Sequence, residues 1–472
     1  MEPYFLAVDF GASGGRHIIA EHRDGRIVLQ EIYRFENGPV RRGGFLCWDL
    51  DYLTEQLIIG MRRCSELGLF PVSVGIDAWG LDFVLLDESG ARISPAVSHR
   101  DPRTAGIYQG IFERVPEAEL YARTGIQMAE FNTLCQLEAL SQSCPEQLCR
   151  ADAMVMLPDY FNYLLTGKLC QEYSNASVTQ LTKAGEARWD TGLIKRLGYP
   201  ERIFLPIRRA GGVLGRLKEE IAERIGFSCE VALVPGHDTA SAFLSLPPEG
   251  AGKLPAISSG TWSLMGMETE APVLTEQARV SGFTNEAGGG EKPLLLKNSL
   301  GLWMIQNIRK EAAPGDSFGA LCRKAEDARI DSMVDCQSQV FLAPSSMSGA
   351  VRDYCRKAGE QVPETAGELA RVVYRSLAAS YGAIFRQMQE LTGREFRRLQ
   401  IIGGGSKADY LNRLTAEAAG IPVFAGPAEA AALGNAVVQM TAMGVFSSLD
   451  EGRRCAAGSN GARVFEPDGR GV

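Results

Sequence analysis

The stretch YFLAVDFGASGGRHIIA, residues 4–20, decides the fold of this chain. Two short β-forming apolar runs, 4–10 and 17–20, flank a turn that is rich in glycine. This pattern predicts a β-hairpin and not a strand that leads into a helix. A third run of the same kind at 26–34 predicts a further strand, and apolar residues at helical spacing predict a helix over 51–68.

The turn of this hairpin, DFGASGGR at 9–16, is a candidate phosphate-binding loop. Glycines at its tip leave the backbone N–H groups open to approach, and Arg16 adds positive charge. Such a nest of amides suits the oxygens of a polyphosphate. From these residues alone, a glycine-rich hairpin without a ligand is an equally good interpretation.

The second half of the chain repeats this opening. SLPPEGAGK at 245–253 concentrates Pro and Gly and predicts a domain boundary, which gives domains of residues 1–245 and 246–472. PAISSGTWSLMG at 255–266 then predicts a second glycine-turned hairpin. A capping-box pattern at Thr365 and Glu368 predicts the start of a long helix, which Gly393 ends.

Two more segments complete the α/β plan. IIGGGS, ending at 406, predicts a buried strand, a triple glycine and a helix start, where a nucleotide could lie against bare backbone; close packing of strand on helix is the competing interpretation. VALVPGHDTASAF at 231–243 predicts a buried strand, a tight turn and a helix. The chain is therefore expected to contain two α/β domains, each opened by a hairpin.

Composition excludes several classes of protein. The 472 residues carry a net charge of −8, which argues against binding to nucleic acid or to an anionic membrane surface. No apolar run approaches the ~18 residues of a spanning helix, and no secretory signal pattern is recognised. The eleven scattered cysteines lack a CxxC pair and are expected to be reduced thiols in the cytoplasm. No obligate protein partner is evident.

One catalytic pattern overlaps the phosphate loop, and one common nucleotide-binding motif is missing. Gly11-Ala-Ser13-Gly-Gly15 satisfies G-x-S-x-G, but the β-branched run that follows it does not form the strand-to-helix elbow of an esterase. A Walker A motif is absent from the sequence. Any nucleotide chemistry is therefore expected to use a different loop.

The chain resembles the FGGY carbohydrate kinases in six motifs that occur in the same order, spread from about residue 5 to about residue 440: DFGASGGR, GIDAWGLDFVLLD, LPDYFNYLLTG, PGHDTASA, SSGTWSLMG and IIGGGS. The resemblance implies two actin-like (ribonuclease H-like) ATPase domains with a cleft between them. It implies phosphoryl transfer from ATP to a sugar. The second and fifth motifs are narrower than the superfamily pattern, and the resemblance there implies that the acceptor is the 1-hydroxyl of L-rhamnulose, within L-rhamnose degradation.

The resemblance also assigns roles residue by residue. The residues that it implies as contacts of ATP are Ala12, Ser13, Gly14, Gly15, Arg16, Thr261, Gln306 and Gly404. On the sugar side it implies Gly80, His237, Asp238, Thr239 and Asn298, with Trp79 and Asp82 as further candidates for shaping the pocket. The chain departs from the family pattern at Gly14, where Ser is usual, at His99, where Tyr is usual, and at Ala78, where Thr is usual.

Asp238 is the predicted general base. A sugar hydroxyl is a poor nucleophile, so phosphoryl transfer needs in-line placement, a proton acceptor and positive charge on the phosphates. An aspartate before Thr239-Ala-Ser-Ala could instead cap the helix, and this segment alone favours the cap. The order of the surrounding motifs favours the base. Mg²⁺ is the expected cofactor, with Asp9, through water, and Asp238 as its candidate ligands. Asp9 could instead pair with backbone amides of the turn that follows it.

Two alternatives remain open from the sequence. The first is the same reaction on another ketose or polyol, such as L-fuculose, xylulose or glycerol. The second is an actin-like nucleotide-binding protein without catalysis, which would have no need of Asp238 in its Gly-His-Asp turn.

Overall fold

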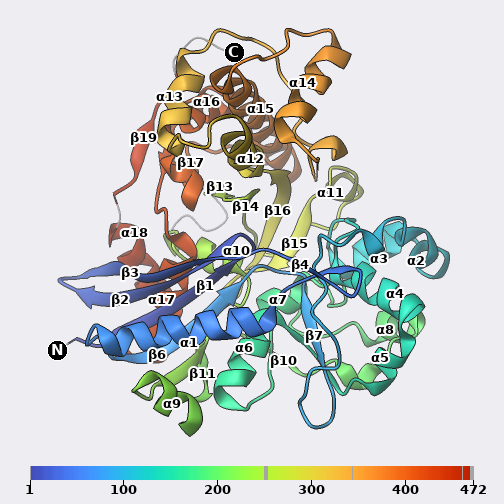
Figure 1. Ribbon diagram of the computed structural model, residues 1–472, viewed down its shortest axis with the longest axis vertical. Coiled ribbons are helices and arrows are strands. Elements are labelled where there is room, and N and C mark those ends of the chain that lie inside the picture. The colour runs from blue at the N-terminus through green and yellow to red at the C-terminus, as the bar shows by residue number, and fades with distance from the viewer. Residues whose placement is uncertain (1, 249–253, 343, 460, 468–472) are drawn as a thin grey trace. The chain divides into compact units, whose positions relative to one another are not determined.

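A computed structural model describes residues 2–248, 254–342, 344–459 and 461–467 (Figure 1). The chain forms two compact units that are not consecutive in sequence. The first consists of Met1–Glu249, Thr269–Leu295 and Ala430–Ser459, and the second of Gly250–Glu268, Leu296–Glu429 and Asn460–Val472.

The domain boundary after residue 245 stays a prediction. Part of its Pro- and Gly-rich stretch, 249–253, lies outside the described residues. By residue number, 269–295 and 430–459 fall within the predicted second domain, yet both segments pack with the first unit.

The first unit is built on a mixed sheet with the strand order β11-β12-β6-β1-β2-β3. The predicted hairpin is confirmed, because β1 and β2 pair antiparallel and β3 pairs antiparallel with β2. Strands β6 and β12 run parallel to β1, and β11 closes the sheet in the antiparallel direction. The bounds are β1 Tyr4–Gly11, β2 Gly14–Arg23, β3 Arg26–Glu36, β6 Pro71–Ala78, β11 Gly212–Arg216 and β12 Glu230–Leu233.

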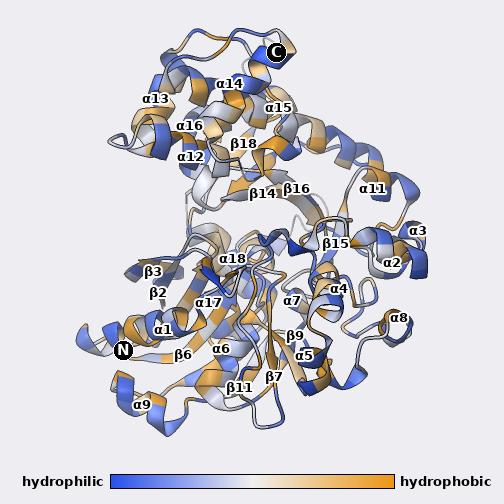
Figure 2. Ribbon diagram, turned by 45° about the vertical axis from the view of Figure 1, so that its right-hand side comes forward, coloured by the Kyte–Doolittle hydropathy of each residue, from blue (hydrophilic) through white to orange (hydrophobic). Residues whose placement is uncertain are grey.

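Helices cover both faces of this sheet. Leu6 and Val8 of β1 join the core with α1 (Leu50–Glu66), whereas Phe5 and Ala7 pack against α17 (Ala430–Ala442). Successive residues of a strand point to opposite faces, so β1 is apolar throughout because both of its faces are buried. Figure 2 shows the corresponding mixture of polar and apolar residues along α1, which has only one face in the core.

The face of β6 that meets α17 is polar. Ser73 Oγ donates to Gln439 Oε1 at 2.7 Å, and Asn435 Nδ2 donates to the Gly75 carbonyl at 3.1 Å and also to Asp77 Oδ2. These residues alternate along β6, so one buried face of the strand is matched to the amides of one helix. Buried polar groups of this kind must be paired to be tolerated.

Further elements of the first unit lie outside this six-stranded sheet, and some of them build a second apolar core. They are β4 Val40–Arg42, β5 Phe45–Cys47, β7 Phe83–Leu86, α2 Tyr108–Arg114, α3 Glu117–Thr124, α4 Thr133–Ser143, α5 Pro145–Arg150, β8 Ala153–Met156, α6 Leu157–Thr166, β9 Gln171–Glu172, α7 Tyr173–Ser177, α8 Thr191–Leu197, β10 Ile207–Arg208, α9 Glu219–Ile225, α10 Asp238–Phe243, α11 Glu276–Val280, β15 Thr284–Ala287 and α18 Leu449–Ser459.

The second unit repeats the same pairing scheme. Its strands follow the order β16-β14-β13-β17-β18-β19, with β13 antiparallel to β14, β17 parallel to β13, β18 parallel to β17 and β19 antiparallel to β18. The predicted second hairpin is therefore confirmed. The bounds are β13 Ala256–Ser259, β14 Trp262–Glu268, β16 Pro293–Leu300, β17 Leu399–Ile402, β18 Val423–Ala425, β19 Arg463–Phe465, α12 Trp303–Ala312, α13 Phe318–Asp327, α14 Met347–Ala358, α15 Ala366–Thr392 and α16 Asp409–Ala419.

Helix α15 follows its sequence signals at both ends. The Thr365 side chain accepts from the Glu368 N–H while the Glu368 carboxylate accepts from the Thr365 N–H, which completes the predicted capping box. Gly393 ends the helix in the left-handed conformation with φ of 61°.

All eleven cysteines lie in the described part of the chain and are free thiols. Within the described ranges, no helix combines the length and the apolar character that crossing a membrane requires.

Candidate active site

Two acidic residues lie side by side where strands β1 and β6 end. Asp9 and Asp77 are register partners in the parallel pair, and their exposed fractions are 5% and 0%. Arg16 pairs with Asp9 across the hairpin, and its Nη2 is 3.0 Å from Asp9 Oδ2. A buried carboxylate requires such compensation, so Arg16 balances the charge of Asp9.

Asp77 is the more deeply buried of the two acids. Burial raises the pKa of Asp77 well above its usual value, the nearby charges of Asp9 and Asp238 raise it further, and the Asn435 hydrogen bond opposes them. Its Oδ1 is buried without a hydrogen-bond partner among the described residues. Asp77 therefore loses its proton less readily than an ordinary aspartate.

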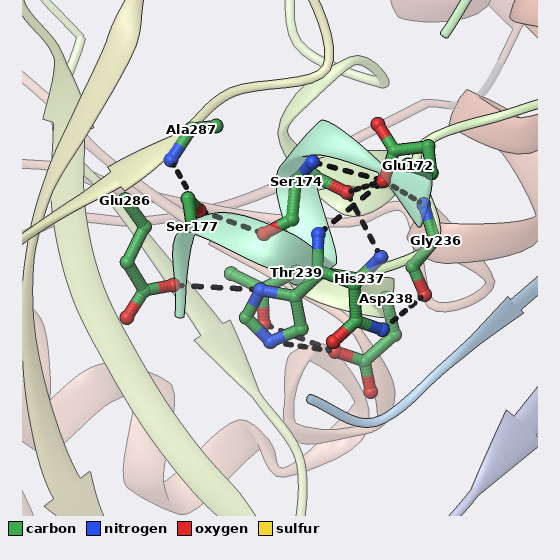
Figure 3. A network of polar contacts seen from close by, with 10 residues as sticks. Glu172, Ser174, Ser177, Gly236, His237, Asp238, Thr239, Glu286 and Ala287 are labelled. Atoms are coloured by element: carbon green, nitrogen blue, oxygen red, sulfur yellow. Dashed lines mark hydrogen bonds and ion pairs between the residues drawn. The ribbon is translucent and has the colours of Figure 1, made fainter. Parts of the chain in front are cut away.

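The turn between β12 and α10 carries Gly236, His237 and Asp238, and Glu172 holds its backbone (Figure 3). The Glu172 carboxylate accepts from the Gly236 N–H at 2.9 Å and from the Ser174 N–H at 2.9 Å. The Ser174 hydroxyl accepts in turn from the His237 N–H at 3.0 Å. Burial raises the pKa of Glu172, and these hydrogen bonds oppose that shift. The backbone of the turn is thus fixed by side chains of β9 and α7.

His237 lies between two carboxylates. Its Nδ1 is 3.4 Å from Glu286 Oε2, and its Nε2 is 3.6 Å from Asp238 Oδ1 (Figure 3). Burial alone would lower the pKa of His237, but Glu286 raises it most strongly and Asp238 and Glu172 add to that effect, so the net direction is upward. The arrangement favours the imidazolium form.

Asp238 is the first residue of α10, and the N-cap position is His237, which makes no side-chain capping bond. The Asp238 side chain remains 35% exposed, and the Thr239 hydroxyl donates to its Oδ1 at 3.2 Å. Partial burial raises the pKa of Asp238, and His237 and Thr239 oppose that shift. The carboxylate is therefore held in place and still accessible.

Gly80 adjoins this turn. A Cβ at Gly80 would lie 3.1 Å from the Val178 side chain and 3.5 Å from the His237 ring. A larger side chain would crowd the histidine, which gives a physical reason for glycine here. Gly80, His237, Asp238 and Thr239 are thus brought together, as the sequence predicts for its sugar side.

Asp82 organises an aromatic cluster in the same unit. Its Oδ2 accepts from Trp48 Nε1 at 2.7 Å, from Trp79 Nε1 at 2.8 Å and contacts His99 Nδ1 at 2.8 Å. Burial alone would raise the pKa of Asp82, but His99 and the two indoles hold it below its usual value. Leu81 has a positive φ of 83°, a strained conformation that marks this turn as structurally constrained.

The first phosphate-loop candidate, 12–16, consists of the tip of the hairpin and the first residues of β2. Ser13 at the tip is exposed. A Cβ at Gly14 would lie 2.8 Å from the Phe35 carbonyl oxygen, and one at Gly15 would lie 2.2 Å from the Phe35 ring. These two glycines are required by packing on β3, so their presence alone does not demonstrate a phosphate site.

In the second unit, Thr261 lies at the turn of the second hairpin, next to the start of α12. The Trp303 N–H donates to the Thr261 carbonyl at 3.1 Å, and Gln306 follows one turn later on the same helix. Asn298 lies on β16, and its Oδ1 is buried without a hydrogen-bond partner among the described residues. An unpaired buried carbonyl of this kind is suited to receive a ligand donor.

The triple glycine separates into two kinds of position. A Cβ at Gly403 would lie 2.9 Å from the Ser259 carbonyl oxygen, and one at Gly405 would lie 2.0 Å from the Ser259 hydroxyl, so both serve close packing. Gly404 is exposed, and a Cβ there would meet no described atom within 4 Å, so it alone of the three is open to a ligand.

Several residues of the site were not predicted from the sequence. Glu172 and Glu286 carry no local motif, and they reach Gly236 and His237, respectively, only through tertiary structure. Asp77 could have been found from the sequence, because an acidic residue inside the apolar run 72–80 must be paired or neutral when it is buried. Asn435 is its partner, and the residues around it on α17 are mostly apolar.

Within the described ranges, no group of three or more His, Cys, Asp or Glu side chains is placed to hold a metal ion. Mg²⁺ in phosphoryl transfer is bound by one or two carboxylates together with phosphates and water. The buried Asp9 carboxylate at the end of β1 is chemically suited to such a role.

Comparison with known proteins identifies the relatives of the chain. Residues 4–245 match the N-terminal domain, and residues 256–443 the C-terminal domain, of the FGGY family of carbohydrate kinases. The chain is 42% identical to a protein named rhamnulokinase from Halalkalibacterium halodurans over 451 residues, which is 96% of each chain. It is 39% identical to a rhamnulokinase from Oceanobacillus iheyensis, again over 96% of each chain.

Solved structures share the fold. A ligand-bound xylulose kinase from Lactobacillus acidophilus matches with a TM-score of 0.79 at 14% identity, covering 99% of this chain and 94% of that one. A Plasmodium falciparum glycerol kinase with ADP matches with a TM-score of 0.77, also at 14% identity, over 99% and 94%. The predicted fold class, two actin-like (ribonuclease H-like) domains, is confirmed.

Proposed function

The chain belongs to the FGGY family of carbohydrate kinases, and we propose that it phosphorylates L-rhamnulose with ATP. The products are L-rhamnulose 1-phosphate and ADP, formed in the cytoplasm during L-rhamnose degradation. The observation that carries this proposal is the 42% identity to a rhamnulokinase over 96% of each chain. Identity at this level over both domains supports the same sugar, whereas the solved structures of other kinases support only the fold.

Asp238 is the proposed general base. Its carboxylate is 35% exposed, and its position is fixed by His237 and Thr239. Both of these contacts involve Oδ1, so Oδ2 is the oxygen available to accept the proton of the sugar 1-hydroxyl. A positioned base contributes about 10²–10⁴-fold to the rate.

The sugar is proposed to contact Gly80, His237, Asp238 and Thr239 in the first unit. The second unit contributes Asn298, whose unpaired Oδ1 can accept from a sugar hydroxyl. The triphosphate is proposed to contact the loop 12–16 of the first unit. Thr261, Gln306 and Gly404 of the second unit complete the proposed nucleotide contacts.

Mg²⁺ is the proposed cofactor, held by Asp9 through water. When bound, the ion neutralises charge on the transferred phosphoryl group. Arg16 is 3.0 Å from Asp9, so the two side chains supply opposite charges at the same corner of the first unit. Asp9 can thereby orient a hydrated cation while Arg16 faces phosphate oxygens.

A coupled assay of ADP release tests the substrate. L-Rhamnulose, L-fuculose, D-xylulose and glycerol are compared at equal concentrations. We expect kcat/KM to be highest for L-rhamnulose. A higher value for one of the other three would replace the sugar in the proposal. If none of the four compounds stimulates the release of ADP, kinase activity toward these substrates is rejected.

The role of Asp238 is tested with Asp238→Asn. This variant should bind ATP and sugar normally and lose about 10²–10⁴-fold in kcat, because the amide cannot accept the proton. Asp152→Asn, which changes an exposed aspartate of the same unit, is the matched control. Near-normal chemistry of Asp238→Asn in a single turnover would exclude Asp238 as the base.

A further inference from the structure

Glu286 is an acidic residue that the proposed reaction does not yet use. It lies on β15, is 6% exposed, and directs Oε2 to Nδ1 of His237 at 3.4 Å (Figure 3). The opposite ring nitrogen, Nε2, is 3.6 Å from Asp238 Oδ1. One imidazole ring therefore connects a buried carboxylate with the proposed base.

The strand that carries Glu286 is fixed on both sides of it. The Asn285 N–H donates to the Gly125 carbonyl at 2.8 Å, and Asn285 Oδ1 accepts from the Val273 N–H at 2.6 Å. On the other side, the Ala287 N–H donates to the Ser177 hydroxyl at 2.9 Å. Because both neighbours are held, the fold fixes the point of the main chain from which the Glu286 side chain reaches the histidine.

The backbone of the His237 turn is held by a different carboxylate. Glu172 accepts from the Gly236 N–H, and Ser174 accepts from the His237 N–H. These contacts fix the main chain and leave the imidazole free to rotate about its own side-chain bonds. The Glu286 contact lies on the side of the ring away from Asp238. Its two atoms, Nδ1 and Oε2, make no hydrogen bond among the described residues, so the contact acts on the ring as an attraction between charges.

We propose that Glu286 is a positioning residue for the phosphoryl transfer, which holds the His237 ring with Nε2 directed at Asp238. The ring in turn engages Oδ1 of Asp238, so that Oδ2 is presented to the sugar hydroxyl. The catalytic part of this inference rests on the proposed function. The contact between Glu286 and His237 can be tested without it.

The charged and titratable groups around the ring are consistent with this role. Glu286 faces it from β15, Asp238 from α10 and Glu172 from β9. Asp77 on β6 acts on Asp238 in its turn. Glu286 can influence Asp238 through the ring of His237, and its charge also raises the pKa of Asp238 directly.

A double-mutant cycle tests the coupling. Glu286→Gln should lower kcat about 30-fold, because the base loses its orientation. The KM for sugar should stay within about threefold, because Glu172 and Ser174 still hold the backbone of the His237 turn. Glu286→Asp, which keeps the charge, should restore part of kcat. Glu291→Gln, an exposed position in the same segment, is the matched control and should behave as the unmodified enzyme.

The decisive comparison uses Asp238→Asn as the background. If Glu286 acts through Asp238, Glu286→Gln should lower kcat only slightly further in a protein that already carries Asp238→Asn. An equal 30-fold loss in both backgrounds would show an independent role and would overturn the proposal. So would an unchanged kcat in Glu286→Gln, or an equal loss in the Glu291→Gln control.

A spectroscopic measurement separates this inference from the proposed reaction. The chain has only four histidines, so ring ¹⁵N resonances can be assigned with His237→Asn. Glu286→Gln should shift the His237 ring nitrogens and leave those of His17, His22 and His99 in place. An unmoved His237 signal would refute the contact, and changes in all four would indicate a general structural effect and refute the positioning role. If the unmodified protein phosphorylates no sugar, the proposed function fails while this measurement still decides the contact.

Discussion

The two glycine-turned hairpins of the chain follow the same strand plan, but their turns differ in chemistry. The first, β1–β2, brings Asp9 and Arg16 together, with Asp77 adjacent on β6. The second, β13–β14, is lined by hydroxyls, and Ser263 Oγ lies 2.6 Å from the hydroxyl of Tyr381. One turn is therefore built around charge and the other around neutral donors.

The glycines of the two hairpins also serve different purposes. Gly15 lies directly opposite Phe35 in the strand pair, and its missing side chain makes room for the aromatic ring. Around Gly260 the nearest atom to a Cβ would be the Trp262 carbonyl oxygen at 3.7 Å, an ordinary contact distance. Two turns that look alike in sequence thus differ in how much substitution they tolerate.

The largest expected effect tests this difference in packing. Gly15→Ala should lower the free energy of unfolding by about 3 kcal/mol, because a methyl group would overlap the Phe35 ring. Gly260→Ala should change it by less than about 1 kcal/mol. Urea denaturation of both variants measures the two values. Equal losses would mean that the hairpins are packed alike.

The second prediction concerns the stability of the fold at acid pH. His17 on β2 is fully buried, Nε2 lies 3.2 Å from the Leu57 carbonyl, and burial lowers the pKa of His17 to about 4. The unfolded chain takes up this proton near pH 6.5 and the folded protein does not, so stability is complete above pH 6.5 and is lost as the pH falls toward 4. From pH 7 to pH 5 the loss at this site should be about 2 kcal/mol.

His17→Gln should remove that part of the pH dependence, because the amide can still donate to the Leu57 carbonyl but does not titrate. Denaturation curves at pH 7 and pH 5 give the comparison, with His22→Gln as the control on the same strand. If both variants keep the full acid sensitivity of the unmodified protein, His17 does not contribute to it.

The third prediction addresses the charge of the first turn. Arg16→Gln should raise the KM for ATP about tenfold, since it removes a cation from the proposed phosphate loop. Arg23→Gln, at an exposed arginine farther along β2, should leave that KM unchanged. Steady-state kinetics with ATP as the varied substrate distinguishes the two. A similar rise in both variants would indicate a long-range effect of net charge instead.

The smallest effect is expected in the neutral turn. Thr261→Val keeps the shape of the side chain but removes its hydroxyl, and it should raise the KM for ATP about threefold. The KM for sugar serves as the internal reference and should change less. A larger change on the sugar side would contradict the proposed nucleotide role of Thr261.

The sequence was informative where structure depends on local pattern. Both hairpins, the capping box at Thr365 and the strand–turn–helix that presents Asp238 follow from short-range signals, and all are present. The same reasoning left open whether Gly403–Gly405 serve a ligand or packing, and the structure separates them, since only Gly404 is uncovered.

The residues that support the site were beyond such reasoning. Glu172, Glu286 and Asn435 come from segments far from the motifs, and their partners are decided by how strands and helices pack. Asp82 was recognised as a pocket candidate, but its simultaneous contacts with Trp48, Trp79 and His99 could not be read from spacing. Tertiary hydrogen bonds of this kind carry no periodic signal.

The packing of α17 against β1 has a consequence for biosynthesis. Gln439 Nε2 donates to the Leu6 carbonyl at 2.9 Å across 433 positions of the chain, and Leu433 and Met440 cover Phe5. At ribosomal speeds of about 5–20 residues per second, the first strand waits roughly 20 to 90 s for this helix to be made. During that interval Phe5 and Ala7 of β1 are uncovered, so a ribosome-bound chain is expected to need a chaperone at this strand until α17 has been made.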